Sequence, residues 1–269
     1  MANCCESGKA GPDSYEPHGK VTTMGRIQVY ETFIVPTNQE RGLLLLLPDG
    51  FGHVTHNFIL ADGFAREGWH VLMPDYFEGD GLPIQFLRRN PNISIEEQPW
   101  PEEDKQKLRD LDFPAWLNRH NHQHVSLLLG ELVAHLSQHH PNATLSGVGY
   151  CFGGKHVLRL AKSSLKVAVA FHPSFVEAED MDNVQAPLYV GLAADDDMVP
   201  ASLAADFQGW SKTRMKEGVP FTLEIYPGVG HGFAARPDTK DEHIRSQYIR
   251  ALRSAVDFLA KNTTKGSSV

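Results

Sequence analysis

Residues 145–155 read LSGVGYCFGGK and contain the pattern Gly-x-Cys-x-Gly. An apolar run beginning at Leu145 leads into Cys151, and a helix-forming segment follows, so the cysteine occupies a turn from a strand to a helix. Gly149 and Gly153 stand two residues before and after the cysteine, where a sharp turn leaves little room for a side chain. This pattern is typical of a nucleophile elbow, with Cys151 where a serine usually stands.

The position of Cys151 at the start of an expected helix also favours nucleophilic catalysis. At a helix N-terminus, free N–H groups and the helix dipole favour both a thiolate and an oxyanion. The bare pattern arises by chance in roughly 2% of chains of this composition, so the strand and helix around it carry much of the argument. The alternative is a buried structural cysteine on a glycine-rich turn.

Strands and helices are expected to alternate through most of the chain. A run as short as Leu43–Leu47, bounded by glycine and proline, is typical of a strand buried on both faces of a parallel sheet. Strands are expected at 27–35, 43–47, 70–73, 145–149, 167–171, 188–192 and 221–226. Helices are expected at 57–67, 116–139, 153–162, after Pro200 and at 241–260. The chain is therefore predicted to form an α/β fold, a mostly parallel central sheet with helices on both faces.

One domain is the simplest organisation for 269 residues. We expect it to span residues 21–262, between a flexible N-terminal tail at 1–20 and a flexible C-terminal tail at 263–269. Residues 80–114 contain five prolines and no regular pattern. Because a connection of this length is unusual, we expect an excursion over one end of the sheet.

Composition excludes several classes of protein. With 25 basic and 33 acidic residues, the net charge is −8, which argues against a nucleic-acid partner. Three cysteines, Cys4, Cys5 and Cys151, are too few for a disulfide framework and fit a reducing compartment. No apolar run reaches the length of a transmembrane helix. We expect a cytoplasmic monomer or homodimer that acts on a small molecule and has no membrane partner.

A thiol nucleophile needs a base, and the base needs an acid that orients it. In folds with an elbow the chain order is nucleophile, acid, histidine. Asp195–Asp197 follows the expected strand 188–192, and His231, flanked by glycines, follows the strand 221–226. Both loops should therefore emerge at the same sheet edge as the elbow. The alternative for His231 is one surface histidine among 14.

Two backbone N–H groups are expected to form an oxyanion hole. One belongs to Phe152, directly after the nucleophile, and the other to Gly50, after the first buried strand. The neighbouring Asp49 stands in the segment Pro48–Gly52. An ordinary Asp-Gly turn explains this segment equally well.

Together these residues resemble the dienelactone hydrolase (carboxymethylenebutenolidase) family of α/β-hydrolases, in particular its eukaryotic branch. The similarity is carried by GYCFGG at 149–154, DDMVP at 196–200 and GHGFA at 230–234. PDYFEGD at 74–80 and the Cys4–Cys5 pair are also similar to that branch. The resemblance implies an α/β-hydrolase fold and a cofactor-free triad that opens esters, typically enol lactones.

The resemblance also implies the roles of single residues. Cys151 is the expected nucleophile and His231 the base, while Asp196 is the expected acid because the family's acid lies four residues before Pro200. The family's bacterial members carry Glu in place of Asp49, and that carboxylate interacts with the resting thiol. We therefore expect Asp49 to tune the thiol rather than to belong to the triad.

The carboxylate-binding arginines of the bacterial pattern are not reproduced. The arginine four residues after the histidine is Ala235 here, with Arg236 next to it, and the second arginine has no counterpart in residues 81–119. A dienelactone substrate is therefore not implied, and pocket selectivity is assigned to residues 80–116. The residues expected to contact the substrate are Phe51, Tyr76, His172, Phe233 and Arg236. For His172 a purely structural role is the alternative.

No metal site is expected. His120, His122 and His124 alternate on an expected helix, and such neighbours cannot converge on one ion. A surface face is the expected role of these histidines.

The predicted reaction is the opening of a lactone or activated ester through Cys151, His231, Asp196 and an acyl-enzyme. One alternative is that the same site catalyses lactonisation or isomerisation in a biosynthetic pathway. The other is a catalytically silent ligand-binding homologue.

Overall fold

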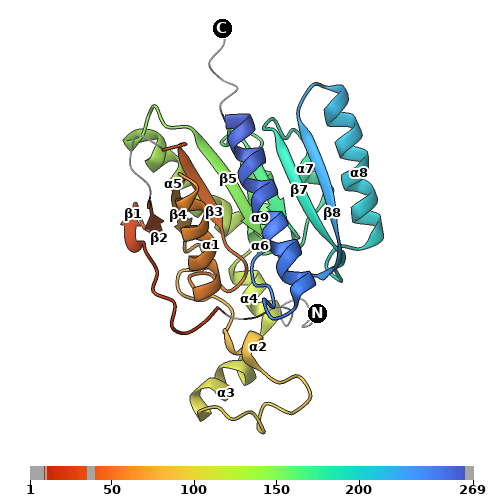
Figure 1. Ribbon diagram of the computed structural model, residues 1–269. Helices are drawn as coiled ribbons and strands as arrows, with labels where there is room; N and C mark the ends of the chain where they lie inside the picture. The colour runs from red at the N-terminus through yellow and green to blue at the C-terminus, as the bar shows by residue number, and fades with distance from the viewer. Residues whose placement is uncertain (1–8, 10, 35–39, 264–269) are drawn as a thin grey trace.

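The computed structural model describes residues 9, 11–34 and 40–263. Its centre is an eight-stranded sheet in the order β1-β2-β4-β3-β5-β6-β7-β8 (Figure 1). Only the β1–β2 and β2–β4 pairs are antiparallel, and all other neighbours are parallel. The strands are β1 (Lys20–Met24), β2 (Ile27–Thr32), β3 (Leu43–Leu47), β4 (His70–Pro74), β5 (Leu145–Tyr150), β6 (Ala168–Phe171), β7 (Leu188–Asp195) and β8 (Phe221–Gly230).

Helices cover both faces of the sheet (Figure 1). One face packs against α1 and α9, and the other packs against α5, α6 and α8. The helices are α1 (Thr55–Arg66), α2 (Gln85–Arg88), α3 (Glu102–Arg109), α4 (Phe113–Arg119), α5 (His122–His139), α6 (Phe152–Leu160), α7 (Ala178–Met181), α8 (Ala201–Lys216) and α9 (Glu242–Thr263). The predicted fold class, a mostly parallel α/β sheet covered on both faces, is confirmed.

The five leucines of β3 explain the three-layer arrangement. Successive side chains of a strand point to opposite faces. Leu43, Leu45 and Leu47 therefore join the layer on one side, and Leu44 and Leu46 join the layer on the other. All five are buried. An unbroken apolar run is required here because neither face of β3 meets water.

The single helix expected at 116–139 is wrong, because the structure has two helices. α4 ends at Arg119 and α5 begins at His122. Asn121 separates them as the N-cap of α5, and its side chain accepts a hydrogen bond from the His124 N–H at 3.0 Å. Apolar residues at helical spacing continue on both sides of this cap, which is why periodicity alone does not reveal the break.

The expected excursion carries α2 and α3. These helices lie beyond one end of the sheet, away from its layers (Figure 1). Part of the excursion returns to the sheet edge, because the Trp116 side chain packs against Gly50 and its indole donates to the Asp80 carbonyl at 2.6 Å. The excursion therefore covers the edge at which the expected site residues lie.

The described part of the expected N-terminal tail lies against the rest of the chain. Lys9 donates its backbone N–H to the Arg236 carbonyl at 2.9 Å. Tyr15 donates its hydroxyl to Asp62 at 2.6 Å, and the His18 N–H donates to the same carboxylate at 2.9 Å. The Cys4–Cys5 pair and residues 264–269 lie outside the described residues.

Candidate active site

The structure forms the elbow that the glycine spacing predicts. Cys151 lies between β5 and α6 with φ 52° and ψ −115°, and its side chain is buried. A Cβ atom on Gly149 would lie 2.3 Å from the Gly153 carbonyl oxygen, and one on Gly153 would lie 2.2 Å from the Leu47 carbonyl oxygen. The backbone therefore closes so tightly around the cysteine that only glycine fits at either position.

Asp196 and His231 meet at the same sheet edge. The His231 Nδ1 atom lies 3.0 Å and 2.9 Å from the two carboxylate oxygens of Asp196. Asp196 is buried and also accepts the Met198 N–H at 2.9 Å, whereas Asp195 and Asp197 are exposed. Of the three adjacent acids, Asp196 is the one that contacts the imidazole.

The Ser174 hydroxyl contacts both the thiol and the imidazole. Its Oγ atom is 3.3 Å from Cys151 Sγ and 3.4 Å from His231 Nε2. The serine is fully buried, and its backbone N–H donates to the Cys151 carbonyl at 3.0 Å. The thiol, the hydroxyl and the imidazole thus form one contiguous polar cluster.

The electrostatics of this cluster favour an ion pair. Burial raises the pKa of Cys151, but the charge of His231, a hydrogen bond with it and the charge of Arg236 together hold that pKa below its usual value. Burial lowers the pKa of His231, but the Cys151 charge and the hydrogen bond to Asp196 outweigh it and raise the pKa to about 10. Both shifts favour the thiolate–imidazolium pair over the neutral thiol and imidazole.

The two expected oxyanion donors belong to the residue after Cys151 and to the loop after β3. Phe152 begins α6, so its N–H belongs to the first turn of that helix. Among the described residues, neither the Gly50 N–H nor the Phe152 N–H donates to a backbone carbonyl.

Asp49 is the centre of a buried charged cluster. It accepts hydrogen bonds from Arg236 at 2.5 Å, from Asn57 at 2.9 Å and from the Phe51 N–H at 3.2 Å, and it pairs with His56 at 3.0 Å. Burial raises the pKa of Asp49, but the charges of His56 and Arg236 outweigh it and hold the pKa well below its usual range. Asp49 is ionised, and its charge raises the pKa of Cys151.

Three of the expected substrate-contacting residues pack within the protein. Tyr76 is buried and donates its hydroxyl to the Pro48 carbonyl. The Phe51 ring lies under the Arg236 guanidinium, 5.4 Å from its central carbon. Phe233 packs against the Tyr226 ring at 4.9 Å. These aromatic side chains support the loops around Cys151.

The two remaining residues of that set differ in their surroundings. Arg236 is buried and bonded to Asp49 rather than open to solvent. His172 is fully buried, and its ring centre lies 4.9 Å from that of His231. Burial lowers the pKa of His172, and the charges of His231 and Arg236 lower it further, so its ring is neutral.

Sequence reasoning missed Ser174. It lies three residues beyond the end of β6, in the loop that also holds His172. Because β6 is the neighbour of β5 in a parallel sheet, any polar residue just after β6 reaches the elbow. This position was the signal available in the sequence.

The surface role expected for His120, His122 and His124 is wrong for His120. The excursion buries its ring, and Asp80 lies 2.8 Å from its Nε2 atom. His124 is bonded to Glu78 at 2.7 Å. Throughout the described residues, no group of three or more His, Cys, Asp or Glu side chains is placed to hold a metal ion. Within the same residues, no helix combines the length and apolar character that a membrane span requires.

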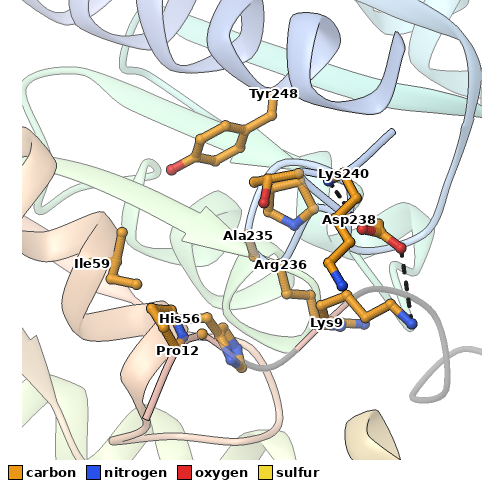
Figure 2. Close-up of a pocket in the computed structure, with 12 residues that line it drawn as sticks. Lys9, Pro12, His56, Ile59, Ala235, Arg236, Asp238, Lys240 and Tyr248 are labelled. Atoms are coloured by element: carbon orange, nitrogen blue, oxygen red, sulfur yellow. Dashed lines mark hydrogen bonds and ion pairs between the residues drawn. The ribbon is translucent and has the colours of Figure 1, made fainter. Parts of the chain in front are cut away.

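A cavity of about 600 Å³ lies beside the Asp49 cluster (Figure 2). α1 contributes His56 and Ile59 to its wall, α9 contributes Tyr248, and the segment after β8 contributes Arg236. Among the described residues that line it, none belongs to the group of Cys151, Asp196 and His231. The cavity is therefore separate from the thiol–imidazole cluster.

The sequence profile described as dienelactone hydrolase family matches residues 31–263. The chain is 29% identical to "Hydrolase tropI" of Talaromyces stipitatus over 95% of this chain and 94% of that protein. It is 25% identical to "Dienlactone hydrolase 1" of Gibberella moniliformis, over 90% of this chain and 88% of that protein. The carboxymethylenebutenolidase homolog of Homo sapiens is 22% identical over 81% of each chain.

Solved structures share the fold. The crystal structure of a putative dienelactone hydrolase from Klebsiella pneumoniae superposes with a TM-score of 0.66 at 16% identity. The superposition covers 90% of this chain and 98% of that one. This agreement concerns the arrangement of strands and helices.

Proposed function

This chain belongs to the dienelactone hydrolase family, and from that premise we propose that it opens a lactone or activated carboxylic ester through a Cys151–His231–Asp196 triad. The observation that carries the proposal is the contact of His231 with Asp196 on one side and with the cysteine cluster on the other. Cys151 stands at the N-terminus of α6, where a thiolate is favoured. The small-molecule ester or lactone is the only partner that this chemistry needs.

The first half of the proposed reaction forms an acyl-enzyme. The Cys151 thiolate attacks the carbonyl carbon, and the carbonyl oxygen becomes an oxyanion that the Gly50 and Phe152 N–H groups bind. When the tetrahedral intermediate collapses, the bond to the leaving oxygen breaks. That oxygen takes the proton from His231 Nε2 and departs as an alcohol, or as an enol if the substrate is an enol lactone.

The second half releases the product. His231, now neutral, takes a proton from water, and the hydroxide attacks the thioester carbonyl. Collapse breaks the carbon–sulfur bond and restores the thiolate beside the imidazolium. Asp196 holds the Nδ1–H tautomer of His231 and stabilises the imidazolium in both halves.

Turnover in heavy-oxygen water tests this function. Hydrolysis places one solvent oxygen in the product acid, whereas lactonisation or isomerisation does not. The Cys151→Ala variant should lose turnover by roughly 10³-fold or more, while Asp195→Asn, an exposed acid beside the site, should keep it. Products without solvent oxygen, or wild-type turnover in folded Cys151→Ala, would overturn the proposal.

A further inference from the structure

The loop after β6 holds Ser174 against the elbow. Cys151 Sγ lies 3.3 Å and His231 Nε2 lies 3.4 Å from the serine Oγ, and the Ser174 N–H donates to the Cys151 carbonyl. The side chain is fully buried, so water does not compete for the hydroxyl. Backbone and side chain both tie this residue to the nucleophile.

The backbone of the loop is shaped to place this hydroxyl. His172 and Phe175 have φ values of 35° and 57°, in the left-handed region that residues other than glycine rarely adopt. Between them, Pro173 packs on the first turn of α6, where a Cβ atom on Gly154 would lie 2.7 Å from Pro173 Cβ. Strained residues of this kind persist where the surrounding structure fixes them, and they cluster at functional sites.

The donors and acceptors of His231, Cys151 and Ser174 determine which group supplies each hydrogen. The His231 Nδ1 atom faces a carboxylate, which only accepts, so Nδ1 carries a hydrogen. In the imidazolium, Nε2 carries a hydrogen too, and that hydrogen already serves the bond between His231 and Cys151 while lying within reach of the Ser174 oxygen. The Ser174 hydroxyl can donate its own hydrogen to the Cys151 sulfur. That sulfur is a weak acceptor as a thiol and a strong one as a thiolate.

We propose that the Ser174 hydroxyl is a further catalytic group, which donates a hydrogen bond to the Cys151 thiolate beside the one that His231 donates. This inference rests on the proposed function, in which Cys151 is the nucleophile. The hydroxyl stabilises the thiolate at rest and fixes the direction of its lone pairs toward the substrate. Because the serine is uncharged, it does so without changing the net charge of the site.

Other groups act on the same thiol and have to be kept constant in a test. The charges of His231 and Arg236 favour the thiolate, and the charge of Asp49 opposes it. Tyr76 and His172 also lie in this environment, and both are neutral near pH 7. Removing a neutral donor leaves all of these charges in place, so a shift of the thiol titration reports the lost hydrogen bond.

The test is the pH dependence of Cys151 alkylation by iodoacetamide, read by peptide mass mapping in the full-length protein. Ser174→Ala should move the midpoint about one pH unit upward, since a hydrogen bond to a charged group is lost. Ser174→Thr keeps a hydroxyl and should restore the wild-type midpoint. Ser146→Ala is the matched control, because this serine is equally buried but faces Thr263 instead of the thiol.

An unchanged midpoint in folded Ser174→Ala would overturn the inference. If that variant does not fold, Ser174→Gly removes the same hydroxyl and is titrated in its place. The titration does not depend on turnover, so the two proposals fail separately. Full turnover in Cys151→Ala would refute the proposed function, whereas a dead Cys151→Ala with an unshifted Ser174→Ala titration would refute only the role of Ser174.

Discussion

In the proposed reaction, the protonation of Cys151 and His231 decides at which pH the site is active. The pKa of Cys151 is lowered and that of His231 is raised to about 10, so the two charged forms coexist between these values. Below this window the thiolate takes up a proton and loses its nucleophilicity. Above it the imidazolium loses its proton and can no longer protonate the leaving group.

Selective alkylation follows from that window. Iodoacetamide should react with Cys151 at a rate that rises with pH and levels off below the ordinary cysteine pKa. His231→Gln removes the charge that lowers this pKa, so its midpoint should lie at higher pH. Peptide mass mapping together with residual activity provides the measurement. Complete loss of activity with labelling only at Cys4 or Cys5 would contradict the assignment.

The three adjacent acids should differ sharply in their effect on turnover. Asp196→Asn removes the acceptor that holds the His231 Nδ1–H and stabilises the imidazolium, so kcat should fall roughly 10³- to 10⁴-fold. Asp195→Asn and Asp197→Asn are matched controls of the same chemistry at exposed positions, and both should remain near wild type. Turnover is compared at equal folded concentration. A larger loss in either control than in Asp196→Asn would reassign the acid.

Asp49 and Arg236 should shift the pKa of the Cys151 thiol in opposite directions, although they form one ion pair. Asp49 raises the pKa of Cys151 and Arg236 lowers it, so Asp49→Asn should move the alkylation midpoint to lower pH and Arg236→Gln to higher pH. Each substitution leaves the partner's charge buried without its counter-charge and should reduce folding stability by roughly 3 kcal/mol. Urea unfolding measures this second effect. Shifts of the same sign in both variants would indicate general loosening instead of electrostatic tuning.

Linkage fixes the pH range in which Asp49 contributes to stability. Its pKa in the folded protein is depressed, so its contribution is complete above the unfolded value of about 3.9 and is lost as pH falls through the folded value. The cluster therefore remains intact throughout the window in which the thiolate and the imidazolium coexist.

The sequence predicts where a site residue lies in the fold only when the strand or helix before that residue can be recognised. Cys151 and His231 follow expected strands, and the parallel sheet brings the ends of those strands together. Ser174 also follows a strand, but it reaches the thiol through a loop with left-handed residues on both sides of it, so its position after β6 places it at the sheet edge without fixing this contact. The pairing of Arg236 with Asp49 joins residues far apart in the chain, so it too appears only in the folded structure.

The elbow between β5 and α6 is the element that positions the nucleophile. A Cβ atom at position 153 would lie 2.2 Å from the Leu47 carbonyl oxygen and 2.7 Å from the Pro48 carbonyl oxygen. Both are backbone atoms and cannot turn away. Gly153 thus determines how closely α6 approaches the end of β3, and with it the distance between the Phe152 and Gly50 N–H groups.

Gly153→Ala should therefore lower the free energy of unfolding by about 3 kcal/mol, the upper part of the range for overpacking, and reduce turnover in the folded fraction. Gly130→Ala is the matched control, because this glycine lies in α5 with no atom within 4 Å of its added Cβ. It should stabilise the protein by about 0.5–1 kcal/mol, since alanine loses less backbone entropy than glycine in a helix. Equal stability of the two variants would show that the elbow tolerates a side chain.

Strand positions follow from the sequence more closely than strand ends. β7 continues to Asp195 and β8 to Gly230, each beyond its apolar run, because the two strands pair with one another past the core with an irregularity near Asp195. β1 was not expected, since Lys20–Met24 is mostly polar and gains its structure from pairing with β2. Apolar patterning reports burial, whereas these segments are held by backbone pairing at exposed positions.

At the scale of the whole molecule, aromatic side chains from both ends of the excursion pack beside the candidate site. The Phe77, Trp116 and Phe152 rings pack together with ring centres 5.1 to 5.8 Å apart. This aromatic group joins residues on either side of the excursion to the first residue of α6, which directly follows Cys151. Substrate selectivity is therefore expected to depend on a part of the chain that carries no residue of the proposed triad. The proposed chemistry depends on the residues at the sheet edge beneath it.

The proposed function depends above all on a covalent intermediate at Cys151. The most direct measurement is acid quenching of the enzyme during turnover of an activated aryl ester, followed by peptide mass mapping. We expect one acyl group per chain, carried by the peptide that contains Cys151, and none in Cys151→Ala. An acyl group on any other residue would contradict this expectation. So would turnover that produces no covalent adduct and that persists in Cys151→Ala.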